Sequence, residues 1–396
     1  MDLDLSHPCI EDLRQRAKKR IPKFIFEYLD SATGRELGLK INREALDAIG
    51  FMPGILEGRV EADMKTTFLG QTFDAPFGIA PVGMSGLIWA GAERHLAKAA
   101  VAHNIPYSLS SVAVASPEDV APYIGDNGWF QFYPVSSPEI RRKMLPRIKA
   151  AGFDTLIFTV DVPEESRRER QRRANLTVPP RIDLATVTSM AAHPAWCLAH
   201  LREGIVPRMR FFDDYISQRG RESFTHAGRL IRGVPDWNSL RELRKEWDGK
   251  LIVKGVMRPE DALRLTEEGA DAIWVSNHSG RQFEAGPAVI DQLPLIRAAV
   301  GPDVPLIYDS GVNWGLDVMR ALAMGANFVM LGRAFQYAVA AFGPKGIDHA
   351  IHILRADIQA NMSQLGTGDL SRLPDYLLKR PVPQSSAPPA VLSKAS

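Results

Sequence analysis

The chain has 396 residues, of which 45% are apolar and 24% are charged, and its 48 Lys and Arg residues nearly balance 46 Asp and Glu. This composition supplies enough apolar side chain for a large core, and it excludes a wholly disordered, collagen-like or coiled-coil protein. A net charge of +2 gives no electrostatic argument for nucleic acid, so no nucleic-acid partner is expected.

The two cysteines, Cys9 and Cys197, cannot make a disulfide framework. Neither lies in a C-x-x-C pair, so no metal site is predicted and a reducing compartment is expected. The start, MDLDLSHPC, has neither the basic nor the apolar region of a signal peptide. We therefore expect a cytoplasmic protein, either free or peripheral on the inner face of the cell membrane.

The predicted elements begin with an N-terminal helical segment, residues 1–75, whose helical pattern is clearest between residues 8 and 50. Eight short apolar runs follow, each ending in Gly or a polar residue. They are FGIAPVG (77–83), PYSLSS (106–111), WFQFY (129–133), TLIFTVD (155–161), LIVKGV (251–256), AIWVSNH (272–278), VPLIYDSG (304–311) and FVMLGR (328–333).

Helical patterns separate these runs, in units of roughly 20 to 30 residues, which is the spacing of parallel strands joined by returning helices. Eight such units predict an α/β fold, a closed (β/α)₈ TIM barrel over residues 76–343. The alternative is an open doubly wound sheet, which usually has fewer strands and a G-x-G-x-x-G turn after the first. No such turn follows residue 83.

The interval between the fourth and fifth strands breaks this rhythm, and we interpret residues 162–235 as an insertion. Residues 184–201 within it contain no Asp, Glu, Lys or Arg. A transmembrane helix would need about 20 mostly apolar residues, whereas this stretch includes His, Ser, Thr and Pro. We interpret it as a lid or an interfacial segment, with an exposed loop as an equal alternative.

After the barrel, residues 344–380 are predicted to form two further helices. The Pro, Ser and Ala composition of residues 381–396 is typical of a disordered tail. Residues 1–380 are therefore expected to form a single domain.

In a TIM barrel the chemistry lies where the strands end, so polar residues there carry the most information. Every predicted strand ends in a glycine or offers a polar side chain. These residues are Gly83, Ser110, Ser111, Gln131, Tyr133, Thr159, Asp161, Lys254, Ser276, Asn277, His278, Asp309, Gly311, Gly332 and Arg333.

Lys254 lies within an apolar run, where an ammonium group is costly unless it meets an anion. The favoured interpretation is a buried lysine that faces a ligand. The alternative is a lysine whose amine extends to the rim of the barrel.

His278 is the only one of nine histidines that ends a predicted strand, and imidazole readily takes a proton near neutral pH. A lone histidine is more often structural, but Arg281 follows it in a tight turn that would aim both groups at one ligand. Asp161 is a candidate partner for the imidazolium, with a capping role as the alternative.

The run RRERQRR (167–173) predicts a solvated loop for most of its arginines rather than a nucleic-acid patch. One arginine at the barrel mouth would instead bind a carboxylate through two parallel hydrogen bonds. Two arginines and a histidine make a site for a small carboxylic acid. Gly332 and Arg333, beside residues 309–311, match the usual phosphate location of a TIM barrel.

Together these motifs resemble the FMN-dependent 2-hydroxy-acid dehydrogenases and oxidases, a family that includes lactate and mandelate dehydrogenases, glycolate oxidase and lactate oxidase. The resemblance runs from about Pro22 to Leu378. Its most specific motifs are VSNHSGRQ (275–282), TVDVPEESRRER (159–170), WFQFY, LIVKGV, DSGVNWGLDVMRALAMGA (309–326) and FVMLGR.

The resemblance implies FMN across the barrel mouth, with Lys254 near the flavin N1 and C2 oxygen, where negative charge grows on reduction. The residues implied for the flavin ring and ribityl chain are Ala80, Pro81, Val82, Gly83, Ser110, Gln131, Thr159, Lys254 and Ser276. Those implied for the ribityl and phosphate groups are Asp309, Gly311, Gly332 and Arg333.

It also implies oxidation of an L-2-hydroxy acid, lactate- or mandelate-like, to the 2-oxo acid. Arg281, Arg168 and the Tyr28 hydroxyl would bind the carboxylate, and Tyr133 would contact the substrate hydroxyl. His278 would be the base, with Asp161 behind it. Removal of the α-carbon proton and removal of the hydroxyl proton during hydride transfer both need this arrangement, so both routes stay open.

Gly83, the GLIW stretch (86–89) and the insertion resemble mandelate dehydrogenase, whereas the oxidases often have Ala at the position of Gly83. We therefore expect electrons to pass from reduced FMN to a quinone or cytochrome. The alternative is an O₂-using oxidase that produces hydrogen peroxide. The resemblance further implies a homotetramer and a peripheral membrane contact through residues 184–212.

Three features depart from the family pattern. Ser279 replaces the usual second Gly after the histidine, Asn313 replaces an Arg, and Phe283 and Glu284 replace a Leu-Asp pair. The first two leave open a non-catalytic FMN-binding barrel, and the third bears on substrate preference. A barrel of the isomerase or nucleotide-dehydrogenase kind is a further alternative, but no cysteine lies in a strand-end loop for nucleotide dehydrogenation.

Overall fold

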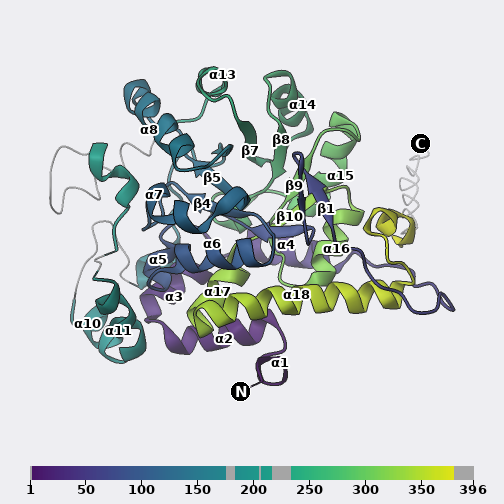
Figure 1. Cartoon of the computed structure of the whole chain (residues 1–396), viewed down its shortest axis with the longest axis horizontal. Helices are drawn as coiled ribbons and strands as arrows, with labels where there is room; N and C mark the ends of the chain where they lie inside the picture. Colours follow the sequence, from purple (N-terminus) through teal and green to yellow (C-terminus); the bar gives the residue numbers. More distant parts are fainter. Residues whose placement is uncertain (1, 175–182, 205–206, 216–232, 379–396) are drawn as a thin grey trace, which may run out of the picture.

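A computed structural model describes residues 2–174, 183–204, 207–215 and 233–378 (Figure 1). Its parallel strands close into a barrel in the order β10-β3-β4-β5-β6-β7-β8-β9, so that the last strand pairs with the first. Leu331 lies beside Ile79 where the barrel closes. The predicted TIM barrel is confirmed, and the open sheet is excluded.

Each barrel strand falls on one of the eight predicted runs. The strands are β3 (Phe77–Ile79), β4 (Tyr107–Ser110), β5 (Gly128–Phe132), β6 (Thr155–Thr159), β7 (Lys250–Val256), β8 (Ala272–Val275), β9 (Leu306–Tyr308) and β10 (Phe328–Leu331). Several strands end earlier than their runs, because the last residues, such as Asp161 and His278, leave the ladder and form the rim of the barrel mouth.

Helices lie between and around the strands. They are α1 (Leu3–Ser6), α2 (Ile10–Arg20), α3 (Lys23–Asp30), α4 (Leu37–Asp47), α5 (Ser85–Ile88), α6 (Ala92–Ala102), α7 (Pro117–Val120), α8 (Pro138–Ala150), α9 (Glu169–Arg173), α10 (Leu184–Ala191), α11 (Pro194–Glu203), α13 (Trp237–Glu246), α14 (Pro259–Glu267), α15 (Val289–Val300), α16 (Gly315–Ala323), α17 (Arg333–Phe342) and α18 (Pro344–Leu365).

An antiparallel hairpin, β1 (Thr66–Phe68) and β2 (Gln71–Phe73), closes the amino end of the barrel. The ring of Phe68 lies 5.3 Å from that of Phe328, and the ring of Phe73 lies 6.3 Å from that of Trp129, measured between centroids. Because the hairpin fills the amino end of the barrel, a ligand can enter only at the carboxyl ends of the strands.

The helical prediction for residues 1–75 is therefore wrong for residues 66–73, although α2, α3 and α4 lie within residues 8–50 as expected. The turn of the hairpin is Leu69-Gly70, in which both residues have positive φ.

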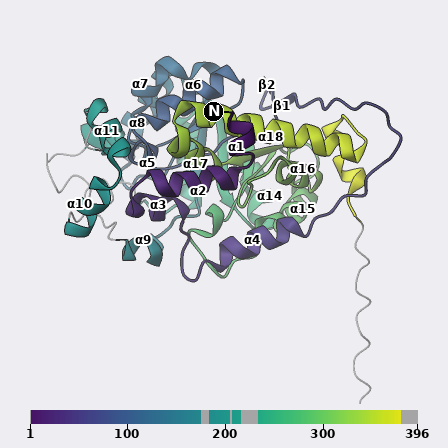
Figure 2. The ribbon, with the colours of Figure 1, turned by 90° about the horizontal axis from the view of Figure 1, so that it is seen from below.

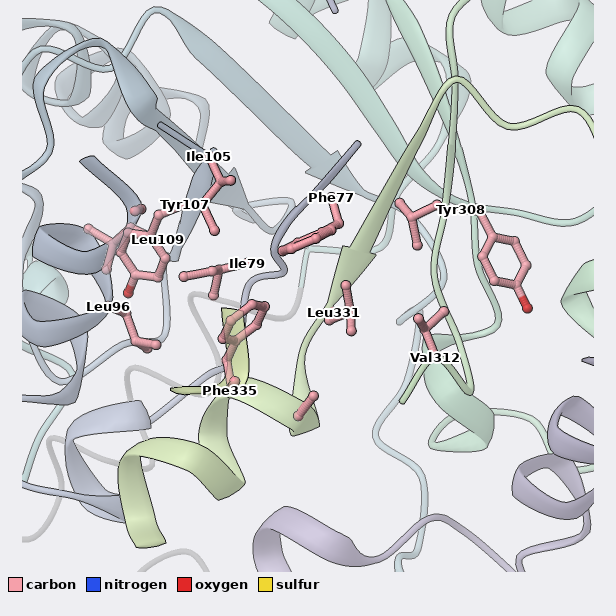
Figure 3. Close-up of a cluster of buried hydrophobic side chains, with 14 of the residues drawn as sticks. Phe77, Ile79, Leu96, Ile105, Tyr107, Leu109, Tyr308, Val312, Leu331 and Phe335 are labelled. Atoms are coloured by element: carbon pink, nitrogen blue, oxygen red, sulfur yellow. The ribbon is translucent and has the colours of Figure 1, made fainter. Parts of the chain in front are cut away.

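The outward-facing strand residues form the larger core against the surrounding helices. Figure 3 shows Phe77 and Ile79 of β3 with Leu331 and Phe335, and these side chains are fully buried. Burying one such side chain contributes about 1.5 to 3 kcal/mol. This core holds the strand ends, and thus the rim residues, in fixed positions.

The insertion carries the helical pair α10 and α11, which lies at one edge of the molecule (Figures 1 and 2). The indole N–H of Trp196 contacts the carbonyl oxygens of Leu87 and Ile88 at 3.2 and 3.1 Å, which attaches α11 to α5. Residues 184–201 are thus a docked helical pair, and the exposed-loop alternative is wrong. Leu184 and Leu201 are nevertheless 79% and 76% exposed.

Of residues 344–380, the described part, residues 344–378, forms one long helix, α18, followed by a 3₁₀ segment (Leu370–Tyr376), rather than two helices. Residues 381–396, for which a disordered tail was predicted, lie outside the described residues. Among the residues that the structure describes, no helix is both long and apolar enough to cross a membrane.

Candidate active site

A cavity of about 500 Å³ opens at the carboxyl ends of the strands. Seventeen of the predicted site residues line it: Tyr28, Ala80, Pro81, Val82, Gly83, Ser110, Gln131, Tyr133, Thr159, Arg168, Lys254, His278, Arg281, Asp309, Gly311, Gly332 and Arg333. The other two, Asp161 and Ser276, lie directly behind His278 and Lys254. The predicted residues, which come from nine separate segments of the chain, therefore come together.

His278 and Asp161 form a pair whose side chains are only 22% and 12% exposed. The imidazole Nδ1 lies 3.1 Å from each carboxylate oxygen of Asp161. Burial lowers the pKa of His278, and the Lys254 charge adds to this, while Asp161 opposes both. Burial alone would raise the pKa of Asp161, but the charges of His278 and Lys254 outweigh it and lower that pKa. A neutral imidazole facing an ionised carboxylate follows.

Arg281 lies in the same turn as His278, and its guanidinium donates to the backbone carbonyl oxygens of Tyr28 and Ser31. Burial and the nearby charges of Arg168 and Arg333 lower the pKa of Arg281 to about 9. Guanidinium does not lose its proton in proteins, so we interpret this as the cost of a partly buried cation that has no ion-pair partner among the described residues. The site is therefore electrostatically prepared for an acid.

Two phenols face this cationic region. The Tyr28 hydroxyl donates to the Gly83 carbonyl oxygen at 2.9 Å. Burial raises the pKa of Tyr28, and burial together with the Asp161 charge raises the pKa of Tyr133. Both hydroxyls therefore keep their protons at neutral pH and can donate hydrogen bonds.

A row of polar side chains crosses the barrel mouth on the next three strand ends. The Ser110 hydroxyl donates to Gln131 Oε1 at 2.7 Å, and Gln131 Nε2 donates to Thr159 Oγ1 at 3.0 Å. All three side chains are buried, and all three line the cavity. Such a row suits a planar ligand with several polar edge atoms.

Lys254 is 4% exposed, so the alternative in which its amine extends to the rim is wrong. Its Nζ donates to the Ser276 hydroxyl at 2.9 Å and lies 3.4 Å from Asp309 Oδ2. Since its amine lines the cavity as well, a positive charge is held at the floor of the site.

The phosphate end predicted from the sequence also lies in the cavity. Gly332 caps the ten-residue helix α17, and no side chain caps that helix N-terminus. Gly311 has φ +93°, a conformation that suits glycine. Backbone N–H groups at a helix N-terminus beside glycines fit a phosphate, and with the polar row and Lys254 they fit FMN.

The basic run divides into different roles. Arg168 lines the cavity, and Arg167 is exposed, but the solvated-loop prediction is wrong for Arg170. Arg170 forms ion pairs with Glu27, Asp30 and Glu36, which fix α9 against α3. The arginines around Asp30 outweigh its burial and lower its pKa to about 2.

Two of the three departures from the family pattern lie in the cavity. Ser279 and Asn313 line it, whereas Phe283 is 69% exposed and Glu284 accepts a hydrogen bond from the Leu37 N–H at 3.1 Å. Phe283 and Glu284 lie outside the cavity lining, so they give no direct contact by which to select a substrate.

Sequence reasoning missed several residues of the site. Asp30 and Arg43 reach the cavity from helices that precede the barrel, and Val112 and Ser310 sit beside predicted residues. For Ser310 the sequence carried a signal, because this residue lies between Asp309 and Gly311, which were both predicted to bind the cofactor. For Asp30 and Arg43 there was none, because only tertiary packing brings α3 and α4 over the mouth.

Comparison with known proteins agrees with this site. The model of the family "FMN-dependent dehydrogenase" matches residues 17–380. The chain is 34% identical to L-lactate dehydrogenase of Pseudomonas aeruginosa PAO1 over 370 residues, which is 91% of this chain and 95% of that one. It is 34% identical to (S)-mandelate dehydrogenase of Pseudomonas putida over 369 residues, 93% of each chain.

Solved structures give the same result. The crystal structure of the monotopic membrane protein (S)-mandelate dehydrogenase superposes with a TM-score of 0.88 at 34% identity, covering 94% of this chain and 99% of that one. A mandelate oxidase variant superposes with a TM-score of 0.78 at 26% identity, covering 92% and 96%. Both a dehydrogenase and an oxidase therefore share this fold.

Proposed function

Because the chain belongs to the FMN-dependent dehydrogenase family, as an FMN-dependent oxidoreductase, we propose that it oxidises an L-2-hydroxy acid, lactate- or mandelate-like, to the 2-oxo acid. One observation carries the proposal. His278 and Arg281, from a single turn, both line the cavity in which the buried Lys254 and the uncapped end of α17 fit the cofactor.

The substrate carboxylate binds at Arg281 and Arg168, and the Tyr28 hydroxyl becomes a further donor by turning from the Gly83 carbonyl oxygen to the carboxylate. Arg281 is a partly buried cation. Desolvation and two neighbouring arginines lower its pKa, so a bound carboxylate relieves an unfavourable arrangement. Carboxylate binding fixes the acid in one orientation, since a guanidinium binds both oxygens at once.

His278 acts as the base. Its Nδ1 faces Asp161, which leaves Nε2 as the nitrogen that accepts a proton. Asp161 orients the ring and stabilises the imidazolium that forms. Tyr133, which keeps its proton, donates a hydrogen bond to the substrate hydroxyl.

FMN would be held by the polar row Ser110, Gln131 and Thr159, by Lys254 and Ser276, and at its phosphate by the backbone around Gly311, Gly332 and Arg333. Bound FMN supplies the acceptor for the two electrons that leave the substrate. Lys254 would supply a buried positive charge that stabilises the negative charge of the reduced cofactor.

We propose a quinone or cytochrome as the next electron acceptor, with the protein peripheral on a membrane through the 184–212 segment. Two features support this. Position 83 is Gly, and α10 and α11 expose Leu184, Val187, Leu198 and Leu201 at one edge of the molecule. The (S)-mandelate dehydrogenase with the same fold is described as monotopic. Assembly as a homotetramer stays a prediction, which analytical ultracentrifugation tests.

Anaerobic stopped-flow absorbance tests the proposal. Protein loaded with FMN is mixed with L- and D-lactate, L- and D-mandelate and glycolate, and the flavin band is followed. We expect L-acids to bleach it and D-acids to leave it unchanged. Reoxidation by a quinone analogue faster than by O₂ supports the dehydrogenase, and faster reoxidation by O₂ supports an oxidase. Flavin-loaded protein that no 2-hydroxy acid bleaches would contradict the proposal.

A further inference from the structure

The turn that bears His278 has an unusual backbone. His278, Ser279 and Gly280 have φ values of 56°, 54° and 70°, so three consecutive residues are left-handed, and two of them are not glycine. Ser310, which lies against this turn, has φ 87°. Such conformations are unfavourable for side-chain-bearing residues and persist only where surrounding contacts hold them.

The contacts that hold the turn form a closed ring. The His278 N–H donates to the Ser276 hydroxyl at 3.0 Å, and the Ser279 N–H donates to the Ser310 hydroxyl at 3.1 Å. The Ser310 hydroxyl in turn donates to Asp309 Oδ1 at 2.6 Å. Each of the two serines, Ser276 and Ser310, therefore accepts a hydrogen bond from one backbone N–H of the turn.

The ring closes through the buried ion pair at the cavity floor. Lys254 Nζ donates to the same Ser276 hydroxyl and lies 3.4 Å from Asp309 Oδ2. Ser276, Asp309 and Ser310 are all buried. In a buried ring of this kind each hydrogen bond polarises the next, so the loss of one member weakens the others.

We propose that Ser310 is a positioning residue, whose hydroxyl fixes the turn bearing His278 to the Lys254–Asp309 pair. This inference rests on the proposed role of His278 as the base. The backbone conformation by itself favours glycine at this position, because glycine adopts φ 87° more easily than serine. Ser310 nevertheless adopts this strained backbone conformation, and its hydroxyl accepts a hydrogen bond from the Ser279 N–H.

If Ser310 positions His278 in this way, loss of its hydroxyl should affect the rate of flavin reduction and leave substrate binding nearly unchanged. Arg281 is held by the carbonyl oxygens of Tyr28 and Ser31, outside the ring, so the carboxylate site survives loss of the hydroxyl. His278 depends on the ring for its backbone position. Loosening the turn moves the imidazole with respect to Asp161 and the substrate, and small displacements of this kind are costly for rate.

Three variants of the FMN-loaded protein test this, by anaerobic reduction with the best L-2-hydroxy acid and by thermal unfolding. Ser310→Gly removes the hydroxyl and relieves strain, and Ser310→Ala removes the hydroxyl and keeps the strain. Ser279→Gly relieves strain and keeps the N–H donor. Ser108→Ala is the matched control, since Ser108 is a buried serine of β4 that does not line the cavity.

We expect both Ser310 variants to reduce the limiting rate of flavin reduction by about tenfold to a hundredfold. The substrate concentration for half-maximal rate should change by less than about threefold. Ser310→Gly should match or exceed the wild-type melting temperature, while Ser310→Ala should melt lower. Ser279→Gly should lose less rate than Ser310→Gly, and Ser108→Ala should reduce at the wild-type rate.

If the reduction rates of the variants rank in the same order as their melting temperatures, and Ser310→Gly is as fast as the wild type, the inference is overturned. The proposed function is then unaffected. The inference is also overturned if the half-maximal substrate concentration rises by the same factor as the rate falls, because the turn would then serve substrate binding. Wild-type protein that no 2-hydroxy acid reduces overturns the proposed function, and the inference falls with it.

Discussion

The imidazole Nδ1 of His278 lies 3.1 Å from both carboxylate oxygens of Asp161, although the two residues are 117 positions apart in the chain. Asp161 follows β6 and His278 follows β8, so the barrel closure brings the pair together. The pair defines which imidazole nitrogen faces the cavity, and several testable consequences depend on it.

The pH dependence of kcat/KM should have its acidic midpoint below 6.5. Burial and the Lys254 charge lower the pKa of His278, so the imidazole is neutral at neutral pH and gains a proton only at lower pH. Since a base must be unprotonated, kcat/KM is constant above the midpoint and falls below it. A midpoint above 6.5 would show that His278 is not the titrating base.

Asp161→Asn should move that midpoint further down and reduce kcat by roughly 10² to 10⁴. The carboxylate is the group that raises the pKa of His278, and it also stabilises the imidazolium. The flavin absorbance of the variant serves as the control for folding and cofactor binding.

Arg281→Lys should raise KM by about tenfold to a hundredfold, because hydrogen bonds to charged groups contribute about 1.5 to 3 kcal/mol and lysine cannot form the forked pair. The effect on kcat should be smaller. Arg167→Lys is the matched control, since that side chain is 80% exposed. An unchanged KM in Arg281→Lys would place the carboxylate elsewhere.

Gly83→Ala should narrow the substrate site. A Cβ at this position would lie 2.7 Å from Val112 Cγ2 and 3.5 Å from the Tyr28 hydroxyl, so Val112 must move. Overpacking costs about 1 to 3 kcal/mol, and we expect kcat/KM to fall by about tenfold or more for an aromatic acid. The double variant Gly83→Ala, Val112→Ala should recover most of this loss, and failure to recover would rule out Val112 as the cause.

Leu184→Glu combined with Leu201→Glu should weaken binding to phospholipid vesicles by at least tenfold in a co-sedimentation assay, since two exposed apolar side chains are replaced by charges. Anaerobic flavin reduction should stay at the wild-type rate, because neither residue lines the cavity. Equal sedimentation of variant and wild type would argue against a membrane role for α10 and α11.

Much of this site follows from the sequence, for a physical reason. In a closed parallel barrel every strand ends at the same rim, so the polar residues that end the eight runs had to converge. Lys254 could be predicted as a site residue because a charge within an apolar run needs a partner. His278 could be predicted because it ends a strand.

Other features could not be obtained in this way. The β1–β2 hairpin was hidden within a segment predicted as helical, because three-residue strands carry almost no periodicity. Arg170 was predicted to be solvated, and its partners Glu27, Asp30 and Glu36 come from helices that only tertiary packing places beside α9. Ser310 lies within the DSG motif, but its contact with the Ser279 N–H could not be predicted, because it forms only when the turn after β8 lies against it.

The central claim is that His278 takes the substrate proton while Arg281 holds the acid against the cofactor site. The most direct test is single-turnover anaerobic reduction of FMN-loaded His278→Asn by a saturating L-2-hydroxy acid. Loss of the base predicts a rate lower than that of the wild type by about 10² to 10⁴, with the flavin still bound. Reduction at the wild-type rate by flavin-loaded His278→Asn would contradict the account.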